Sequence, residues 1–177
     1  MQVDLRKWAG VEMRRVEDLS ELGPGSVGFL WTPFALQREA EKASLLNEAR
    51  RVVESGGTWA FVDVLPASMA GHWVYQVFSD AWKGERELTW DTFQVYNELV
   101  KAGFEVSLKQ RSFHQAVALE VAWRMASERE RCPQLKLLPD AVYEEGLAGL
   151  KEELEREGGA TQKPSEFCLM EVTAVKK

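Results

Sequence analysis

Apolar and polar positions along the chain follow two different periods, which predict strands and helices in alternation. Near-continuous apolar runs over residues 26–32 and 58–65 are typical of buried parallel strands. Period-two alternation over residues 11–16 and 104–113 predicts two further strands, and the run 167–175 predicts the last one. The pattern therefore predicts about five strands.

Segments between the predicted strands carry apolar residues at helical spacing. This spacing predicts helices over residues 36–54, 89–101, 116–131 and 139–157, and the glycines at 56–57 are expected to end the first of them. Strands that alternate with helices indicate an α/β protein with a mostly parallel, layered sheet and flanking helices.

The composition mainly excludes classes of protein. Hydrophobic residues make up 45% of the 177 residues, which fits a single globular domain over residues 1–177. The net charge is −6 and no stripe of Lys and Arg follows a predicted helix, so we expect no nucleic-acid partner. The apolar runs are too short to span a bilayer, and the first residues do not resemble a signal peptide. We therefore expect a cytoplasmic protein with no membrane partner.

Cysteine and histidine side chains predict neither a disulfide framework nor a metal site. Cys132 and Cys168 lie far apart, and together with His72 and His114 they show no metal-ligand spacing. Residues 23–28 formally match G-x-G-x-x-G, but a strand follows them instead of a helix, and proline supplies no backbone donor. We predict an ordinary turn there.

Four local features occur in a fixed order along the chain. They are the acidic-Leu stretch 17–19 after a strand, the segment 48–57 (EARRVVESGG), the strand end 62–64 (VDV) and the segment 99–104 (LVKAGF). Segment 48–57 is similar to an R-V-L-x-P-G-G turn, and segment 99–104 to an L-x-x-A-G-F helix end. Together they resemble the C-terminal two-thirds of the class I S-adenosylmethionine-dependent methyltransferase family over residues 11–177.

This resemblance implies a truncated Rossmann-like methyltransferase fold. Residues 116–160 would form a two-helix cap inserted before an antiparallel last strand, and that strand would lie between the strands at 58–65 and 104–113. A last strand at the sheet edge would instead indicate an unrelated α/β ligand-binding protein. The implied activity is S-adenosylmethionine-dependent methyl transfer to a small molecule.

The sequence departs from the family at the cofactor-binding turn. The family's first strand, its Gly-rich turn and its second strand amount to roughly 60 residues, whereas ten residues precede Val11. The cofactor site would therefore need completion by a partner chain or a missing segment. The alternative is a non-catalytic, self-associating binding or assembly module that retains the fold, and in either case we expect a homodimer or a partner chain.

The resemblance also suggests cofactor-binding residues. Asp18, with Leu19 beside it, matches the carboxylate that meets the adenine amino group in the family, although a solvated turn carboxylate is the alternative. Trp31, Thr32 and Pro33 end a central strand, where α/β sheets place ligands, although strand-end packing explains them equally well.

His72 is the candidate catalytic base, because an imidazole can accept a proton near neutral pH. A surface-loop histidine is the more frequent case, and His114 is predicted to be structural. Aromatic residues after the strand 58–65 would line an apolar substrate pocket. Alternatively, they would belong to the core or to a dimer interface. They are Trp73, Tyr75, Phe78 and Trp82.

Overall fold

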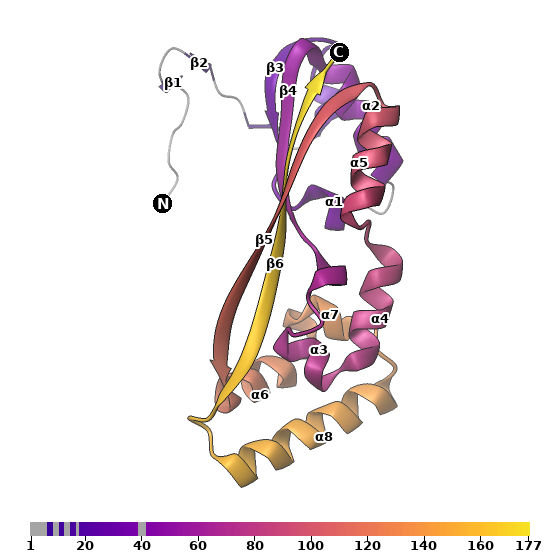
Figure 1. The fold of residues 1–177 in the computed structure, drawn as a ribbon. Coiled ribbons are helices and arrows are strands. Elements are labelled where there is room, and N and C mark those ends of the chain that lie inside the picture. Colours follow the sequence, from indigo (N-terminus) through magenta and orange to yellow (C-terminus); the bar gives the residue numbers. More distant parts are fainter. Residues whose placement is uncertain (1–6, 9–10, 13–14, 17, 39–41) are drawn as a thin grey trace.

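In the computed structural model the chain forms a sheet lobe and a helical lobe, and a long ribbon of two antiparallel strands runs from one lobe to the other (Figure 1). The structure describes residues 7–8, 11–12, 15–16, 18–38 and 42–177. The sheet lobe contains β3 (Val27–Trp31), α1 (Ala35–Arg38), α2 (Lys42–Val52), β4 (Val53–Val64), α5 (Thr92–Lys101), β5 (Phe104–Ala118) and β6 (Gln162–Lys176). The helical lobe contains η2 (Pro66–Ser68), α3 (Trp73–Val77), α4 (Ser79–Leu88), α6 (Leu119–Ser127), η3 (Arg129–Arg131), α7 (Pro133–Lys136) and α8 (Asp140–Glu157).

The strand order in the sheet lobe is β3-β4-β6-β5. Strand β3 is parallel to β4, whereas β6 is antiparallel to both of its neighbours. The last strand therefore lies inside the sheet, between β4 and β5, and this prediction is confirmed. The prediction of a mostly parallel sheet of about five strands is wrong. The sheet has four strands and is mixed. Strand β6 runs antiparallel between β4 and β5, so β3 and β4 form the parallel pair of this sheet.

The predicted strand at 11–16 does not join this sheet. Its first two residues form β2 (Val11–Glu12), which pairs antiparallel with β1 (Lys7–Trp8) in a separate two-stranded ladder, and residues 15–16 belong to no strand. Residues 13–14 lie outside the described residues. Within the part of the chain that the structure describes, β3 pairs with β4 alone and is an edge strand.

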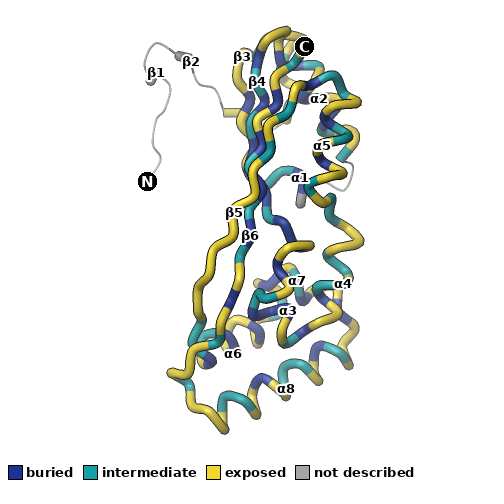
Figure 2. Tube along the Cα trace, in the orientation of Figure 1, coloured by how far each residue is buried: buried dark blue, intermediate teal, exposed yellow. Residues whose placement is uncertain are grey.

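One face of the sheet carries the apolar core of the sheet lobe. Trp59, Phe61 and Phe104 are fully buried, and the ring of Trp59 lies 4.9 Å from that of Phe61 and 6.0 Å from that of Phe104. Helices α2 and α5 stand on this side (Figure 1), and the dark blue positions in Figure 2 run along β4 and β6. On the opposite face Phe29 and Trp31 are 59% and 52% exposed.

The first predicted helix ends earlier than its sequence suggests. Helix α2 stops at Val52, and residues 53–57 already belong to β4; residues 39–41 lie outside the described residues. Lys176 from β6 donates to the carbonyl oxygens of Arg50 and Val53 at 2.6 and 2.7 Å, which satisfies acceptors at the end of α2. A distant lysine therefore caps the helix that glycine was expected to end.

The glycines at 56–57 serve a bulge in β4 instead. Val27 pairs with Val53, but Phe29 pairs with Thr58, so β4 contains extra residues between these two points. Gly56 has a φ of 78°, which a glycine adopts at little cost in such an irregularity.

The hairpin of β5 and β6 extends further than predicted. Its ladder continues through Ala116, Val117 and Ala118, so the helix predicted from residue 116 begins at Leu119. Pairing with residues 162–164 outweighs the helix preference of the two alanines in this short stretch. Helix α8 forms as predicted and ends at Gly158, whose φ is 86°.

Buried side chains of α3, α4, α6, α7 and α8 form a second core in the helical lobe (Figure 2). Cys132 and Cys168 are free, buried thiols within it. Across the ranges that the structure describes, no helix has the length and apolar character that a membrane span requires.

Candidate functional site

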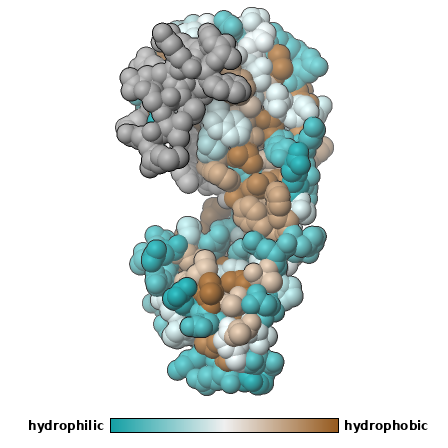
Figure 3. Space-filling view, turned by 90° about the vertical axis from the view of Figure 1, so that its left-hand side faces the viewer, coloured by the Kyte–Doolittle hydropathy of each residue, from teal (hydrophilic) through white to brown (hydrophobic). Residues whose placement is uncertain are grey.

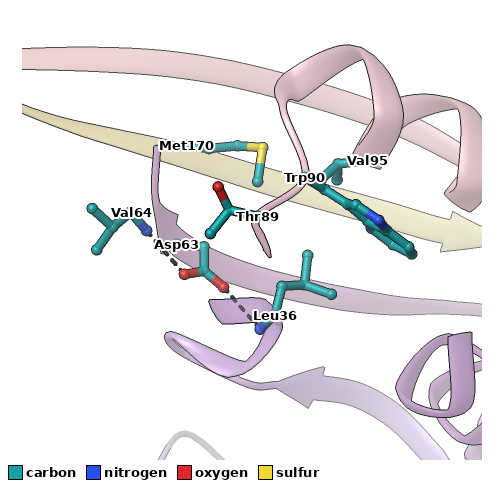
Figure 4. Close-up of a pocket in the computed structure, with 7 residues that line it drawn as sticks. All are labelled: Leu36, Asp63, Val64, Thr89, Trp90, Val95 and Met170. Carbon is teal, nitrogen blue, oxygen red and sulfur yellow. Dashed lines mark hydrogen bonds between the residues drawn. The ribbon is translucent and has the colours of Figure 1, made fainter. Parts of the chain in front are cut away.

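A shallow pocket lies at the carboxyl end of β4, near the junction of the two lobes. Ligands of open α/β sheets bind at the carboxyl ends of strands, so this location makes it the candidate site. We call it the strand-end crevice (Figure 4). Its lining residues are Leu36, Asp63, Val64, Thr89, Trp90, Val95 and Met170.

Asp63 is the buried polar centre of the crevice. Its side chain is 1% exposed, and its Oδ2 and Oδ1 atoms accept hydrogen bonds from the backbone amides of Leu36 and Val64, each at 2.9 Å. The first bond ties the start of α1 to the end of β4 (Figure 4). The sequence contained the signal for this role, because a carboxylate in an apolar strand requires partners when it is buried.

The turn between β3 and α1 holds a strained residue next to Asp63. Phe34 has a φ of 56°, which is uncommon for a side chain of its size, and its amide donates to the carbonyl of Val62 at 2.7 Å. Strain of this kind persists where surrounding contacts fix the backbone. Asp63 and Val62 therefore hold the strand-end turn in one conformation.

Trp31, Thr32 and Pro33 flank the crevice without lining it. Thr32 Oγ1 accepts a hydrogen bond from Trp59 Nε1 at 2.8 Å, and its amide donates to the carbonyl of Ala60 at 3.2 Å. Trp31 and Pro33 are exposed. The Thr32 hydroxyl thus has a packing role, and contact of these three residues with a cofactor stays a prediction.

Asp18 and Leu19 lie at the other end of the sheet. Asp18 begins a short 3-10 helix, η1 (Leu19–Glu21), where it accepts from the Ser20 amide at 2.8 Å, and this bond lowers the pKa of Asp18. Arg51, which precedes the start of β4 by two positions, donates to the carbonyl of Leu19 at 3.0 Å. The structure therefore does not bring Asp18 and Leu19 together with Trp31 and the strand end.

His72 is the N-cap of α3. Its Nδ1 atom accepts a hydrogen bond from the Val74 amide at 3.4 Å, and burial lowers the pKa of the imidazole. The side chain therefore favours the neutral state, with Nδ1 as acceptor and the proton on Nε2. A role as catalytic base stays a prediction. His114 lies on β5 with an exposed side chain.

The predicted substrate-binding aromatics pack inside the helical lobe. Trp73, Tyr75 and Phe78 are 2–4% exposed, and Trp82 Nε1 donates to the carbonyl of Pro66 at 2.8 Å. This packing agrees with one of the three alternatives that the sequence allowed, a place in the core. Contact of these side chains with a substrate stays a prediction.

A half-buried polar contact joins Tyr75 and Glu85, and no pattern in the sequence predicts it. The Tyr75 hydroxyl donates to Glu85 Oε2. Burial raises the pKa of both side chains, so the tyrosine holds its proton, and protonation of Glu85 is eased.

We expect the His72 cap to make stability pH-dependent. A pKa lowered on folding means that the unfolded state binds the proton more tightly, so this contribution is present above pH 6.5 and is lost as the pH falls below it. Urea titrations at pH 7.5 and 5.5 should show a loss of up to about 1 kcal/mol in the wild type. His72→Asn, which keeps a cap acceptor, should lose less between these pH values. His114→Asn is the control and should behave as the wild type; equal losses in all three proteins would contradict the role of His72.

The described residues of the crevice do not by themselves fit S-adenosylmethionine. The cavity volume is about 10 Å³, room for roughly one water molecule, whereas sites for ligands of that size span roughly 300–1,000 Å³. The carboxylate of Asp63 already accepts two backbone hydrogen bonds, and the turn after β3, Thr32-Pro33-Phe34, contains no glycine. Within the described ranges no group of three or more His, Cys, Asp or Glu side chains is placed to hold a metal ion.

No protein-family model matches the chain, and no curated protein matches it. Solved structures do. A candidate methyltransferase from Bacillus halodurans shares 16% identity at a TM-score of 0.52, with 88% of this chain and 72% of that chain covered. A candidate methyltransferase of an antibiotic biosynthesis pathway from Anabaena variabilis shares 15% identity at a TM-score of 0.55, with 85% and 68% covered.

Phosphoethanolamine N-methyltransferase 2 of Haemonchus contortus, whose structure contains S-adenosylhomocysteine, is a more distant match. It shares 14% identity at a TM-score of 0.45, and this chain covers 36% of its length. At these identities the likeness concerns the fold, and it rests on the first two structures. Together with the antiparallel β6 inside the sheet, they show that the chain has the methyltransferase-like Rossmann fold.

Proposed function

We propose that this chain is a binding and assembly module with a methyltransferase-like fold, whose partner adds to the free edge of β3. The observation that carries this proposal is the edge itself, because among the described residues β3 pairs with β4 alone. Strand β3 (VGFLW) has no charged residue and no proline, and Phe29 and Trp31 on it are more than half exposed. Natural edge strands usually carry charges, prolines or bulges that prevent pairing with another chain.

The opposite edge of the same sheet is protected in that way. Strand β5 presents Glu105, Lys109 and Arg111 as exposed residues, and Arg111 forms an ion pair with Glu171 at 2.5 Å. The contrast between the two edges supports β3 as the edge at which further polypeptide pairs.

S-adenosylmethionine-dependent methyl transfer to a small molecule is the second candidate function. The position of the strand-end crevice at the carboxyl end of β4 favours it, because α/β sheets bind ligands there. The crevice is too small alone, so this function requires polypeptide added at β3 to complete the cofactor site.

Titration calorimetry with S-adenosylhomocysteine separates these two functions. We expect the purified chain to release no measurable heat, which corresponds to a Kd weaker than about 1 mM. A self-contained S-adenosylmethionine-dependent methyltransferase that binds S-adenosylhomocysteine serves as the positive control. Micromolar binding to this chain alone would overturn the assembly proposal and favour the second candidate.

A further inference from the structure

We propose that the partner at β3 is a second copy of this chain, paired antiparallel strand to strand about a two-fold axis at Phe29. This inference rests on the proposed function and names its partner. Such a dimer would join two four-stranded sheets into one continuous sheet, and each copy would cover the other's open edge.

The backbone of β3 presents the right groups for this pairing. The amides of Thr32 and Phe34 donate to the carbonyls of Ala60 and Val62, so the even-numbered positions face β4. Successive residues of a strand point their amide and carbonyl groups to opposite edges. The odd-numbered residues Val27, Phe29 and Trp31 therefore direct theirs to the free edge, where a two-fold pairing would form about six backbone hydrogen bonds.

The side chains of β3 are self-complementary in this register. With Phe29 on the axis, Phe29 faces Phe29 of the partner subunit, and Val27 faces Trp31 of the partner subunit. Aromatic–aromatic and aromatic–β-branched pairs are favourable across strands. On the other face Gly28, beside which the Glu54 carboxylate lies, meets Leu30 of the partner subunit.

These aromatic side chains stand on the open face of the sheet. Phe29, Trp31, Ala60 and Thr173 share that face by register, whereas the neighbouring Leu30 belongs to the buried one. Figure 3 looks at the molecule from this side, and apolar side chains gather over the middle of the sheet lobe. The pairing would therefore bring apolar surfaces of the two copies next to each other.

Charge and area predict a weak dimer. Strand β3 itself is neutral, but the Glu54 carboxylate lies beside Gly28 and each chain carries a net charge of −6, so like charges of the two copies lie close to the contact. Half-exposed aromatic side chains contribute about 100 Å² each, and the whole contact falls below the roughly 1,600 Å² of a standard interface. We expect a Kd in the range of about 10–100 µM, which becomes lower as added salt screens the repulsion.

Two experiments on the intact chain test this pairing. Sedimentation equilibrium should show a concentration-dependent dimer, and Trp31→Lys should raise its Kd at least about 10-fold because it places like charges near the axis. Phe93→Lys is the matched control, since Phe93 is 72% exposed on α5, away from β3, and it should leave the Kd unchanged.

Phe29→Cys tests the register itself. Opposed residues in a hydrogen-bonded antiparallel pair have Cα atoms about 5.5 Å apart, within the span of a disulfide. Mild oxidation should therefore cross-link Phe29→Cys into a dimer, whereas Phe113→Cys, on the same open face but on β5, should give no more dimer than the wild type.

The outcomes separate this inference from the proposed function. A monomer at all concentrations up to about 100 µM, or a dimer that Trp31→Lys leaves intact, would overturn the second copy as partner. Absence of the Phe29→Cys cross-link in a dimeric sample would overturn this register. None of these results affects the calorimetric test of the proposed function. Binding of S-adenosylhomocysteine to this chain alone is the result that would contradict that function.

Discussion

Asp63→Ala is expected to lower the free energy of unfolding by about 2–4 kcal/mol. The substitution removes the acceptor of two backbone amides, those of Leu36 and Val64, in a position that is 1% exposed. A buried amide without a partner costs more than the net value of the bond it made. Urea denaturation monitored by tryptophan fluorescence measures the change.

Two further variants make the Asp63 prediction specific. Asp63→Asn keeps one oxygen acceptor and should cost about half as much as the alanine variant. Asp80→Ala removes a half-exposed carboxylate whose ion pair with Lys83 lies on the surface, so its effect should stay within about 0.5 kcal/mol. A loss for Asp63→Ala as small as that for Asp80→Ala would contradict the role assigned to Asp63.

Gly146→Ala and Gly149→Ala are expected to change stability in opposite directions, although both glycines lie on α8. A Cβ atom at Gly146 would lie 2.4 Å from Cε1 of Phe78, a ring that is 2% exposed and stacks on Tyr143 at 6.2 Å. Overpacking a fixed ring of this kind costs typically about 1–3 kcal/mol, more than alanine gains in helix propensity. We therefore expect a net loss of about 2 kcal/mol.

Gly149 provides the matched control for this clash. A Cβ atom there would meet no heavy atom within 4 Å, so Gly149→Ala should raise the free energy of unfolding by about 0.5–1 kcal/mol. Thermal melts and urea titrations of both variants give the comparison. If both substitutions stabilise the protein, the Phe78 ring moves away from the new Cβ atom at residue 146 without a loss of free energy of unfolding, and the prediction is contradicted.

Local signals in the sequence identified the ends of α5 at Lys101 and of α8 at Glu157, whereas the start predicted at 89 lies three residues before α5 and the end predicted at 131 lies four residues beyond α6. Asp91 forms a capping box with Gln94 at the start of α5, and Gly103, with a φ of 87°, follows its end. Both features depend on residues within one turn of the helix end, so a local pattern is enough to predict them. Gly158 ends α8 in the same way.

The candidate site was harder to predict from the sequence than the helix ends. The ends of β3 and β4, which carry Thr32 and Asp63, lie next to each other because the two strands run parallel, and the strand pattern predicts such neighbouring ends. Asp18 could not be placed, because its position depends on hydrogen bonds of Arg51 to the loop that precedes β3. The cap function of His72 likewise depends on where the short helix α3 begins.

The sequence by itself determined where most strands and helices lie and that they alternate, because hydrophobic periods and glycine or cap residues act over a few positions. Tertiary structure alone decided that β3 is an unprotected edge, that Lys176 rather than the glycines at 56–57 ends α2, and how far the β5–β6 hairpin extends. These features depend on contacts between segments far apart along the chain or on the absence of a neighbouring strand among the described residues, and no local period records either.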